Sequence, residues 1–290
     1  MESFLHQVLG GLATGGIYAA LALALVMIYQ ATHHVNFAQG ELAMFSTYLG
    51  WFMLNHGVPY WAAFLGTVVI SFGAGIVIER TIIRPMQHAP VLSVVIVFIA
   101  LMLIFNSLAS FLFGTDIQTF PSPFASVDAW PQPYMSSHEL GVLLVTLLVV
   151  VLLYGFLRFT SVGLALRAVA VNQQSSRLCG VRVGWMLALG WGLAAAIGAI
   201  AGMMVAPVVF LEPGMMGGMM VYAFAAALVG GIDNPWGAVL GGFIVGVLEN
   251  LAGAYLIGTE LKLTVALALI VLVLLVKPSG LLGKHAVTRV

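Results

Sequence analysis

The polar side chains that could do chemistry in this 290-residue chain are few and lie at or within long apolar runs. Asn36, Gln39 and Glu41 open one apolar stretch, and Glu249 and Asn250 fall inside another. An ionised side chain at the centre of a bilayer costs about 2.5–3.5 kcal/mol on insertion scales, so such groups usually face a cavity or a partner. Glu41 could instead lie in the first turn of a helix, where the helix dipole favours a negative charge. The five residues are candidates for lining a solute pathway.

The sequence gives little support for catalysis. None of the acidic residues and histidines falls in a metal-binding pattern such as His-Glu-x-x-His. The chain also has neither a Gly-x-Ser-x-Gly nucleophile motif nor a Gly-Lys-Ser/Thr phosphate loop. Cys179 is the only cysteine, which excludes an intrachain disulfide. We therefore expect no enzymatic activity, no metal and no ATP-binding site in this chain.

The composition is that of an integral membrane protein. Hydrophobic residues make up 62% of the chain, charged residues 7%, and the mean hydropathy is +1.11. A soluble domain is about half apolar and about a quarter charged. The formal net charge is zero, which argues against nucleic-acid binding. No charged residue occurs at 3–40, 42–78 or 85–115, and each gap exceeds the roughly 20 apolar residues that a transmembrane helix needs.

Charge gaps and helix breakers divide the chain into nine apolar segments. They cover residues 8–29, 37–54, 61–78, 91–113, 140–157, 183–205, 219–229, 238–257 and 261–276. The seventh is too short to span a membrane fully and the second begins in polar residues, so either could be broken or re-entrant. The predicted fold is an all-α polytopic bundle of eight or nine transmembrane or re-entrant helices, forming one transmembrane domain over residues 1–290.

Basic residues predict the orientation, because they are enriched on the cytoplasmic side. They gather at 80–84, 158–182 and 277–289, whereas the loop at 114–139 carries acidic residues only. Alternation through nine segments then places the C-terminus in the cytoplasm and the N-terminus outside. The outer loop is rich in proline and aromatic residues. It could be a connector resting on lipid headgroups or a docking surface for an external partner.

The segment at 158–183 holds four of the ten basic residues. At helical spacing one side of the segment is a mostly apolar stripe, with arginines and glutamine elsewhere, which suits a helix lying along the inner membrane surface or in a partner's groove. This stripe contains Leu164, Ala168, Val171, Ser175 and Leu178. Gly180 is a suitable stop for such a helix. An ordinary positive-inside loop would explain the arginines alone, but less well the length of the segment.

Several motifs, in order along almost the whole chain, resemble the branched-chain amino acid permease family of binding-protein-dependent ABC importers. They are residues 35–41, 79–85, 167–172 followed by 180–181, 225–238 and 274–281. Two positions depart from the family pattern. Val171 stands where an acidic residue is usual, and Gln87 where a further basic residue is usual. Because Val171 has no acidic group, the resemblance does not support a charge contact with an ATPase at this position.

The resemblance implies a permease subunit in a bacterial-type inner membrane. It implies a second permease subunit, identical or homologous, an external solute-binding protein, and cytoplasmic ATPase subunits that bind and hydrolyse the ATP. Its coupling segment corresponds here to Arg167, Ala168, Asn172, Arg177 and Gly180.

The expected solute is a branched-chain or related amino acid, with amides or urea as the family's other choices. A stand-alone secondary transporter or channel is the alternative of a different class. A membrane-embedded enzyme would need clustered catalytic side chains that the sequence lacks.

Overall fold

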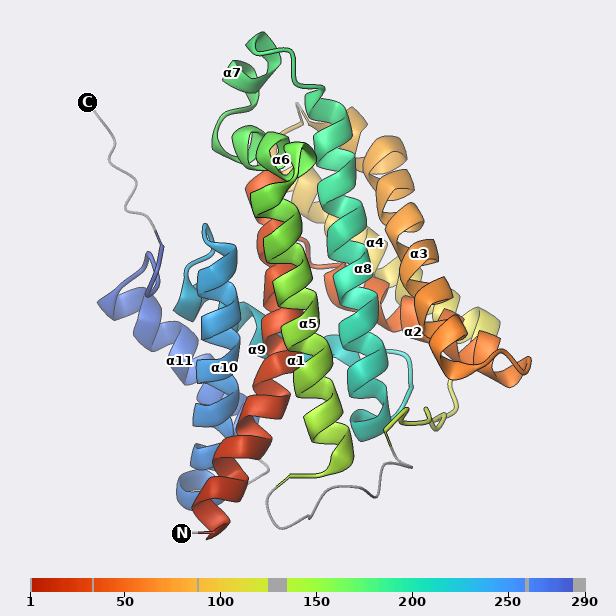
Figure 1. Ribbon diagram of the computed structural model, residues 1–290, viewed down its shortest axis with the longest axis vertical. Helices are drawn as coiled ribbons and strands as arrows, with labels where there is room; N and C mark the ends of the chain where they lie inside the picture. The colour runs from red at the N-terminus through yellow and green to blue at the C-terminus, as the bar shows by residue number, and fades with distance from the viewer. Residues whose placement is uncertain (1, 33, 88, 125–134, 259–260, 284–290) are drawn as a thin grey trace. The chain divides into compact units, whose positions relative to one another are not determined.

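The computed structural model describes residues 2–32, 34–87, 89–124, 135–258 and 261–283 (Figure 1). In this part of the chain the regular elements are helical, and an isolated β-bridge joins Gln118 to Leu211. The α-helices are α1 (Glu2–Thr32), α2 (Gln39–Asn55), α3 (Tyr60–Ile78), α4 (Val91–Phe113), α5 (Ser137–Phe159), α6 (Ser161–Val171), α7 (Gln173–Leu178), α8 (Val183–Val209), α9 (Met216–Gly230), α10 (Pro235–Ala252) and α11 (Lys262–Val276). Shorter 3-10 or π turns are η1 (Glu79–Ile83), η2 (Arg84–Met86) and η3 (Gly253–Ile257). The predicted all-α fold is confirmed for the described residues.

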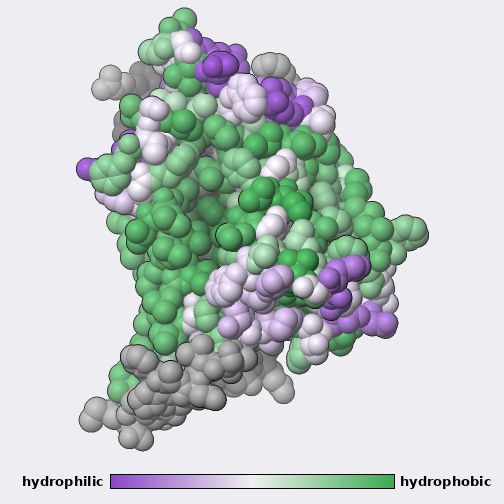
Figure 2. Space-filling view, turned by 45° about the vertical axis from the view of Figure 1, so that its right-hand side comes forward, coloured by the Kyte–Doolittle hydropathy of each residue, from purple (hydrophilic) through white to green (hydrophobic). Residues whose placement is uncertain are grey.

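Each of the nine apolar segments expected from the sequence corresponds to a helix, from α1 to α5 and from α8 to α11. Among the described residues, six helices are long and apolar enough to cross a membrane. They are Ser3–Gln30, Tyr60–Met86, Val91–Phe113, Ser137–Phe159, Val183–Val209 and Pro235–Leu256. Helices α2, α9 and α11 are shorter, so a count of eight or nine spans stays a prediction, as does the orientation of the termini. The face drawn in Figure 2 is mainly hydrophobic, as a surface in contact with lipid must be.

The chain divides into two compact units. Unit 1 comprises residues 1–26, 123–147 and 218–290, and unit 2 comprises residues 27–122 and 148–217. Both units are therefore assembled from segments far apart in the sequence. The single transmembrane domain expected from the sequence stays a prediction.

In unit 1, glycines allow α1 and α10 to approach backbone to backbone. A Cβ atom added at Gly15 would lie 2.9 Å from the carbonyl oxygen of Gly242, and one at Gly11 would lie 2.8 Å from the Cα of Val247. A Cβ atom at Gly246 would overlap the backbone of Gly15. Small residues four apart favour such close helix contacts in lipid. Helix packing thus explains the spacing of four residues between Gly11 and Gly15 and between Gly242 and Gly246.

Two of the sequence motifs meet within unit 1. The chain after α11 returns to the end of α9, where Leu281 N donates to Val229 O at 2.8 Å and Leu282 N donates to Gly230 O at 3.0 Å. Gly280 adopts a φ of 75°, which glycine reaches without steric cost. The motif at 274–281 therefore caps the helix that contains the motif at 225–238.

Unit 2 is built on α8, against which α2 and α3 pack. Trp191 of α8 is buried and stacks on Phe98 of α4, with ring centroids 6.0 Å apart. Gly75 of α3 lies directly on the backbone of α8, since a Cβ atom there would be 2.6 Å from the Trp191 carbonyl oxygen. The hydroxyl of Ser71 on α3 donates to that of Ser46 on α2 at 2.8 Å. This packing holds α8 against α3 and α4 around Trp191.

The loop expected on the outer side is described only in part, because residues 125–134 lie outside the described residues. Its first half is anchored in unit 2, where Gln118 and Leu211 exchange two backbone hydrogen bonds of 2.9 Å each. Phe120 is buried and contacts the ring of Tyr60 edge-on. Whether the loop is a connector or a docking surface stays an open prediction.

Candidate functional site

The arginine-rich segment at 158–183 folds as two short helices, α6 and α7, between α5 and α8. Figure 1 shows α6 lying across the ends of α5 and α8. Thr160 is the N-cap of α6, and its Oγ1 accepts a hydrogen bond from Gly163 N at 2.9 Å. A Cβ atom at Gly163 would lie 2.6 Å from the Cα of Leu157, so a larger residue would push α6 away from the end of α5.

The continuous apolar stripe predicted for this segment is wrong, because the helix breaks at Asn172. This residue ends α6 in an extended conformation, with φ −157° and ψ 108°, and at once caps α7. Its Oδ1 accepts a hydrogen bond from Ser175 N at 2.9 Å. Asparagine side chains compete with helical hydrogen bonding in this way, which favours them at caps. Ser175 and Leu178 consequently do not continue the face of α6.

Gly180 ends α7 as the sequence predicts. It has a φ of 80°, its N donates to Arg177 O at 3.0 Å, and Val181 N donates to Ser176 O at 3.0 Å. This pair of hydrogen bonds is the Schellman motif, in which a glycine adopts the left-handed conformation after the helix. The segment is therefore an ordered structure with defined caps.

One side of α6 is held by α8 and the other side is exposed. Val169 is buried against Val183 and Leu187 of α8. The five residues predicted to couple to an ATPase all lie on the exposed part of the segment: Arg167, Ala168, Asn172, Arg177 and Gly180. Large apolar side chains are exposed beside them, with Val171 at 83% and Leu178 at 90%. The segment thus presents a mixed basic and apolar surface.

Asn36, just before α2, and Gln39, the first residue of α2, are fully buried and hydrogen-bonded inside unit 2. Asn36 Oδ1 accepts from Ala38 N at 3.0 Å, and its Nδ2 donates to Gln39 Oε1 at 3.4 Å. Gln39 Nε2 donates to the carbonyl oxygen of Ala194 in α8 at 3.0 Å. These two residues thus hold the start of α2 against α8, which is a structural role whether or not they also contact a solute.

Glu41 lies in the first turn of α2 and is almost fully buried. Its Oε2 accepts a hydrogen bond from Asn106 Nδ2 of α4 at 3.2 Å. The helix dipole favours a carboxylate at this position, which agrees with the alternative prediction that Glu41 lies in the first turn of a helix. The sequence analysis did not select Asn106. It could have done so, because Asn106, like Glu249, is a polar residue inside a long apolar run.

A small cavity of about 60 Å³ lies among α2, α3, α4 and α8 in unit 2. Its lining is mainly apolar, with two serine hydroxyls: Leu42, Phe45, Ser46, Leu49, Ser71, Ala74, Gly75, Phe105 and Ala195. Leu42 and Phe105 each adjoin a member of the Glu41–Asn106 pair in the sequence. The Glu41 and Asn106 side chains themselves are not part of the cavity lining.

Glu249 and Asn250 lie on α10 in unit 1. Glu249 is 5% exposed, and the hydroxyls of Tyr18 and Tyr222 lie near its carboxylate, whose Oε2 has no hydrogen-bond partner among the described residues. The two tyrosine rings stack with centroids 4.7 Å apart. Asn250 Nδ2 donates to the carbonyl oxygen of Gln7 at 2.8 Å, and its Oδ1 accepts from Lys262 Nζ at 2.9 Å. Tyr18, Tyr222 and Lys262 were missed in the sequence because nothing in the spacing relates them.

The described residues contain no group of three or more His, Cys, Asp or Glu side chains that could hold a metal ion. Of the two carboxylates predicted for the pathway, Glu41 accepts a hydrogen bond from an asparagine and Glu249 lies near two tyrosine hydroxyls. What the arrangement can do is bind and guide a solute, or transmit movement.

Comparison with known proteins gives the family. A model of the family described as "Branched-chain amino acid transport system / permease component" matches residues 7–274. The high-affinity branched-chain amino acid transport system permease protein LivH of Escherichia coli (strain K12) is 32% identical over 306 residues, covering 99% of this chain and 98% of that protein. The corresponding protein BraD of Pseudomonas aeruginosa is 29% identical, with 99% and 98% covered.

Among solved structures, PsaBC from Streptococcus pneumoniae in complex with Fab aligns with 96% of this chain and 91% of its own, at 13% identity and a TM-score of 0.47. That likeness is too low to support an argument. The match to the family over residues 7–274, together with the 32% identity to LivH over nearly the full chain, shows that this chain belongs to the family of permease components of branched-chain amino acid transport systems.

Proposed function

We propose that this chain is the transmembrane permease subunit of a binding-protein-dependent ABC importer that carries branched-chain or related amino acids into the cytoplasm. Partner ATPase subunits bind and hydrolyse the ATP, an external binding protein delivers the solute, and a second permease subunit completes the pathway. The chain itself acts in a bacterial-type inner membrane with its C-terminus in the cytoplasm. This proposal rests on family membership and on the form of the α6–α7 segment.

The observation that carries the proposal is that α6 and α7 are ordered helices with a largely exposed surface. A connector between two spans needs only a few residues, whereas this segment has two capped helices and a Schellman motif. Val171 and Leu178 expose large apolar surfaces there, and burying such a side chain stabilises a contact by about 1.5–3 kcal/mol. A protein partner that covers this surface gains that energy.

The basic residues beside these side chains define the partner further. Arg167 and Arg177 are exposed, and charge-assisted hydrogen bonds to carboxylates are the strongest that they can make. Val171 replaces the usual acidic residue of the family, so this docking surface relies on shape and apolar contact together with the arginines. We therefore expect the ATPase groove to be apolar with acidic residues at its edge.

We further propose that Glu41 lines the solute pathway. An amino acid carries an ammonium group that a buried carboxylate can bind and an apolar side chain that needs a dry cavity. Glu41 supplies a buried carboxylate, and unit 2 also contains a mainly apolar cavity of about 60 Å³ that Leu42, the next residue of α2, helps to line. Asn36, Gln39, Glu249 and Asn250 remain pathway candidates. For Asn36, Gln39 and Asn250, the hydrogen bonds inside their own units already account for their burial.

The experiment that tests the proposal is purification from native membranes in mild detergent, followed by reconstitution into vesicles. We expect an ATPase, a permease partner and a binding protein to co-purify, and solute uptake to require both ATP and the binding protein. A chain that purifies alone and transports on an ion gradient would overturn the proposal. That result would favour a secondary transporter, for which buried Glu249 would be the first residue to examine.

A double variant tests the docking surface separately. Replacing Arg167 by Ala and Gly180 by Ala should lower ATP-driven uptake by about tenfold, because one change removes a charged contact and the other strains a residue at φ 80°. The amount of protein inserted in the membrane should not change. The matched control is Arg158→Ala, at the end of α5 and outside the predicted coupling residues. Unchanged uptake in the double variant would refute the role of α6–α7.

A further inference from the structure

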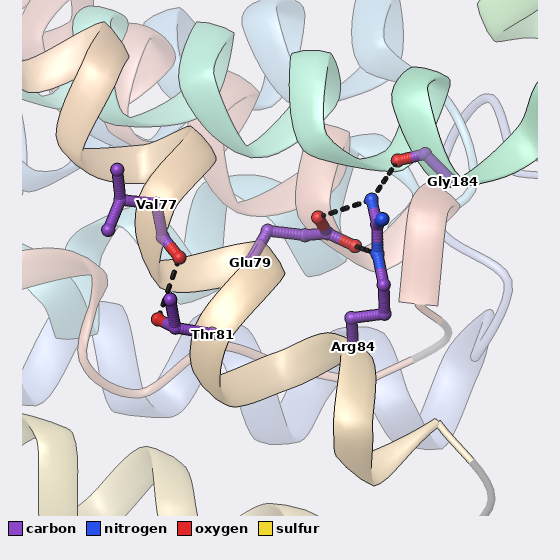
Figure 3. A network of polar contacts seen from close by, with 5 residues as sticks. All are labelled: Val77, Glu79, Thr81, Arg84 and Gly184. Atoms are coloured by element: carbon purple, nitrogen blue, oxygen red, sulfur yellow. Dashed lines mark hydrogen bonds and ion pairs between the residues drawn. The ribbon is translucent and has the colours of Figure 1, made fainter.

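An ion pair at the end of α3 involves none of the residues of the α6–α7 segment or of the proposed solute pathway. Glu79 is the first residue of the π-helical turn η1 and is 1% exposed. Arg84 Nη2 lies 3.0 Å from Glu79 Oε2, and Arg84 Nε lies 3.3 Å from Glu79 Oε1 (Figure 3). This forked geometry fixes both side chains, because two parallel hydrogen bonds restrict a planar guanidinium.

The π-helical turn is what makes the pair possible. Residues five apart on an α-helix point about 140° away from each other, because each residue turns the helix by about 100°. In η1 the backbone N of Arg84 donates to the carbonyl oxygen of Glu79, which is the five-residue hydrogen bond of a π-helix. The wider turn therefore brings residues 79 and 84 to the same side, and such turns recur at functional sites.

The same guanidinium also binds the first turn of α8. Arg84 Nη2 donates to the carbonyl oxygen of Gly184 at 2.5 Å, a contact between residues 100 positions apart in the sequence (Figure 3). A Cβ atom at Gly184 would lie 3.2 Å from Arg84 Cζ, so the glycine provides the room for this approach. Arg80, in the same turn, stacks on Trp185 with its Cζ 3.6 Å from the ring centroid. Two arginines thus attach η1 to consecutive residues of α8.

The residues of α8 on either side of this contact also hold α6. Val183 precedes Gly184 and Leu187 follows one turn later, and both are buried with Val169 of α6. The chain of direct contacts therefore runs from α6 to the first turn of α8 and from there through Arg84 to Glu79. Each link lies in unit 2.

We propose that Arg84 is a positioning residue that makes the α6–α7 segment and the end of α3 move as one body. A displacement imposed on α6 by a partner then reaches α3 through the Gly184 carbonyl, the Arg84 guanidinium and the buried Glu79 carboxylate. This inference rests on the proposed function for the source of the displacement. The contacts themselves do not depend on it, because they can be tested without ATP or solute.

The first experiment measures, in the purified full-length protein, whether η1 and the α6–α7 segment keep a fixed distance from each other. Cys179 is the only cysteine of the chain and is exposed after α7, so it can carry one spin label. Thr81→Cys, on the exposed side of η1, provides the second. We expect a narrow distribution of label-to-label distances in this doubly labelled protein and a clearly broader one when Arg84→Gln is added. An equally narrow distribution in the Arg84→Gln protein would overturn the proposal, whatever the protein transports.

The second experiment measures coupling in the reconstituted complex. Arg84→Gln should lower the number of solute molecules taken up per ATP hydrolysed by about fivefold or more, while the ATPase still co-purifies and hydrolyses ATP. Arg84→Lys keeps the charge but cannot make the forked contacts, so it should restore the ratio only in part. Complexes whose uptake and hydrolysis fall in equal proportion would contradict the positioning role.

Two further variants separate the contact from general stability. Thr81→Val is the matched control, because its hydroxyl donates only to the Val77 carbonyl oxygen of its own helix at 2.8 Å (Figure 3). It should leave the ratio unchanged. Gly184→Ala keeps every hydrogen-bonding group but displaces the guanidinium, so it should lower the ratio if Arg84→Gln proves too unstable to purify. A normal ratio in Gly184→Ala would then reject the proposal, whereas a wild-type complex without ATP-driven uptake would reject the proposed function instead.

Discussion

Glu41 and Glu249 are both buried carboxylates on apolar helices, but the protein accommodates them in different ways. Glu41 lies in the first turn of α2, where free backbone N–H groups and the helix dipole favour a negative charge, and it has a single asparagine partner. Glu249 lies within α10 and is met by two tyrosine hydroxyls, with Lys262 on the next helix bound to the adjacent Asn250. One carboxylate is supported by local backbone geometry and the other by side chains from three further helices.

This difference suggests different roles. A carboxylate that interacts with side chains from α1, α9 and α11 holds those helices together. We therefore expect its loss to lower the stability of the protein. A carboxylate with one hydrogen-bond partner keeps capacity to bind another ligand, so we expect its loss to change transport. Burial alone does not distinguish these roles, because both side chains are at most 9% exposed.

The largest effect should come from Glu249→Ala. The change leaves both tyrosine hydroxyls without their acceptor and opens a cavity next to the glycine contact of α1 and α10. We expect the free energy of unfolding to fall by about 2 kcal/mol or more, measured as a lower midpoint of thermal unfolding in detergent. Glu249→Gln, which keeps an acceptor oxygen, is the control and should stay close to wild type. A stable Glu249→Ala protein with altered transport would reverse the assignment of the two carboxylates.

Glu41→Gln should have a smaller effect, and on transport alone. The amide oxygen can still accept from Asn106, so the thermal midpoint should stay near that of the wild type. The ammonium group of an amino acid would lose its ionic partner, and hydrogen bonds to charged groups contribute about 1.5–3 kcal/mol. We expect the solute concentration for half-maximal uptake to rise by about tenfold. Normal uptake kinetics would mean that the carboxylate serves only the first turn of α2.

The sequence predicted the helices better than the contacts between them, for a physical reason. Long charge-free runs determine where membrane helices can form, and residues 91–113 were predicted with the observed bounds of α4. Gly180 was recognised as a helix stop because its requirement is local. The break at Asn172 was missed because the apolar spacing continued through it, although an asparagine in that position competes with the helix for hydrogen bonds.

Long-range partners had no comparable signal. Asn106 is 65 residues from Glu41, and Gly184 is 100 residues from Arg84, so no periodicity relates them. The π-helical turn at Glu79 also leaves no mark in hydropathy, yet it decides which side chains meet. The sequence could therefore nominate Glu41 and the residues of motif 79–85, while their roles depend on the helices packed against them.

The smallest effects should come from the two tyrosines, and they sharpen the comparison most. Tyr18→Phe and Tyr222→Phe each remove one hydroxyl from Glu249 while the ring stack at 4.7 Å remains. Hydrogen bonds between membrane helices contribute about 0.6 kcal/mol on average, so each variant should be only slightly less stable than wild type. If the two hydroxyls share the carboxylate, the double variant should lose more than the sum of the single losses, because Glu249 would then keep neither donor. Thermal unfolding of the four proteins in parallel gives this coupling, and strict additivity would show that the two hydroxyls act independently of each other.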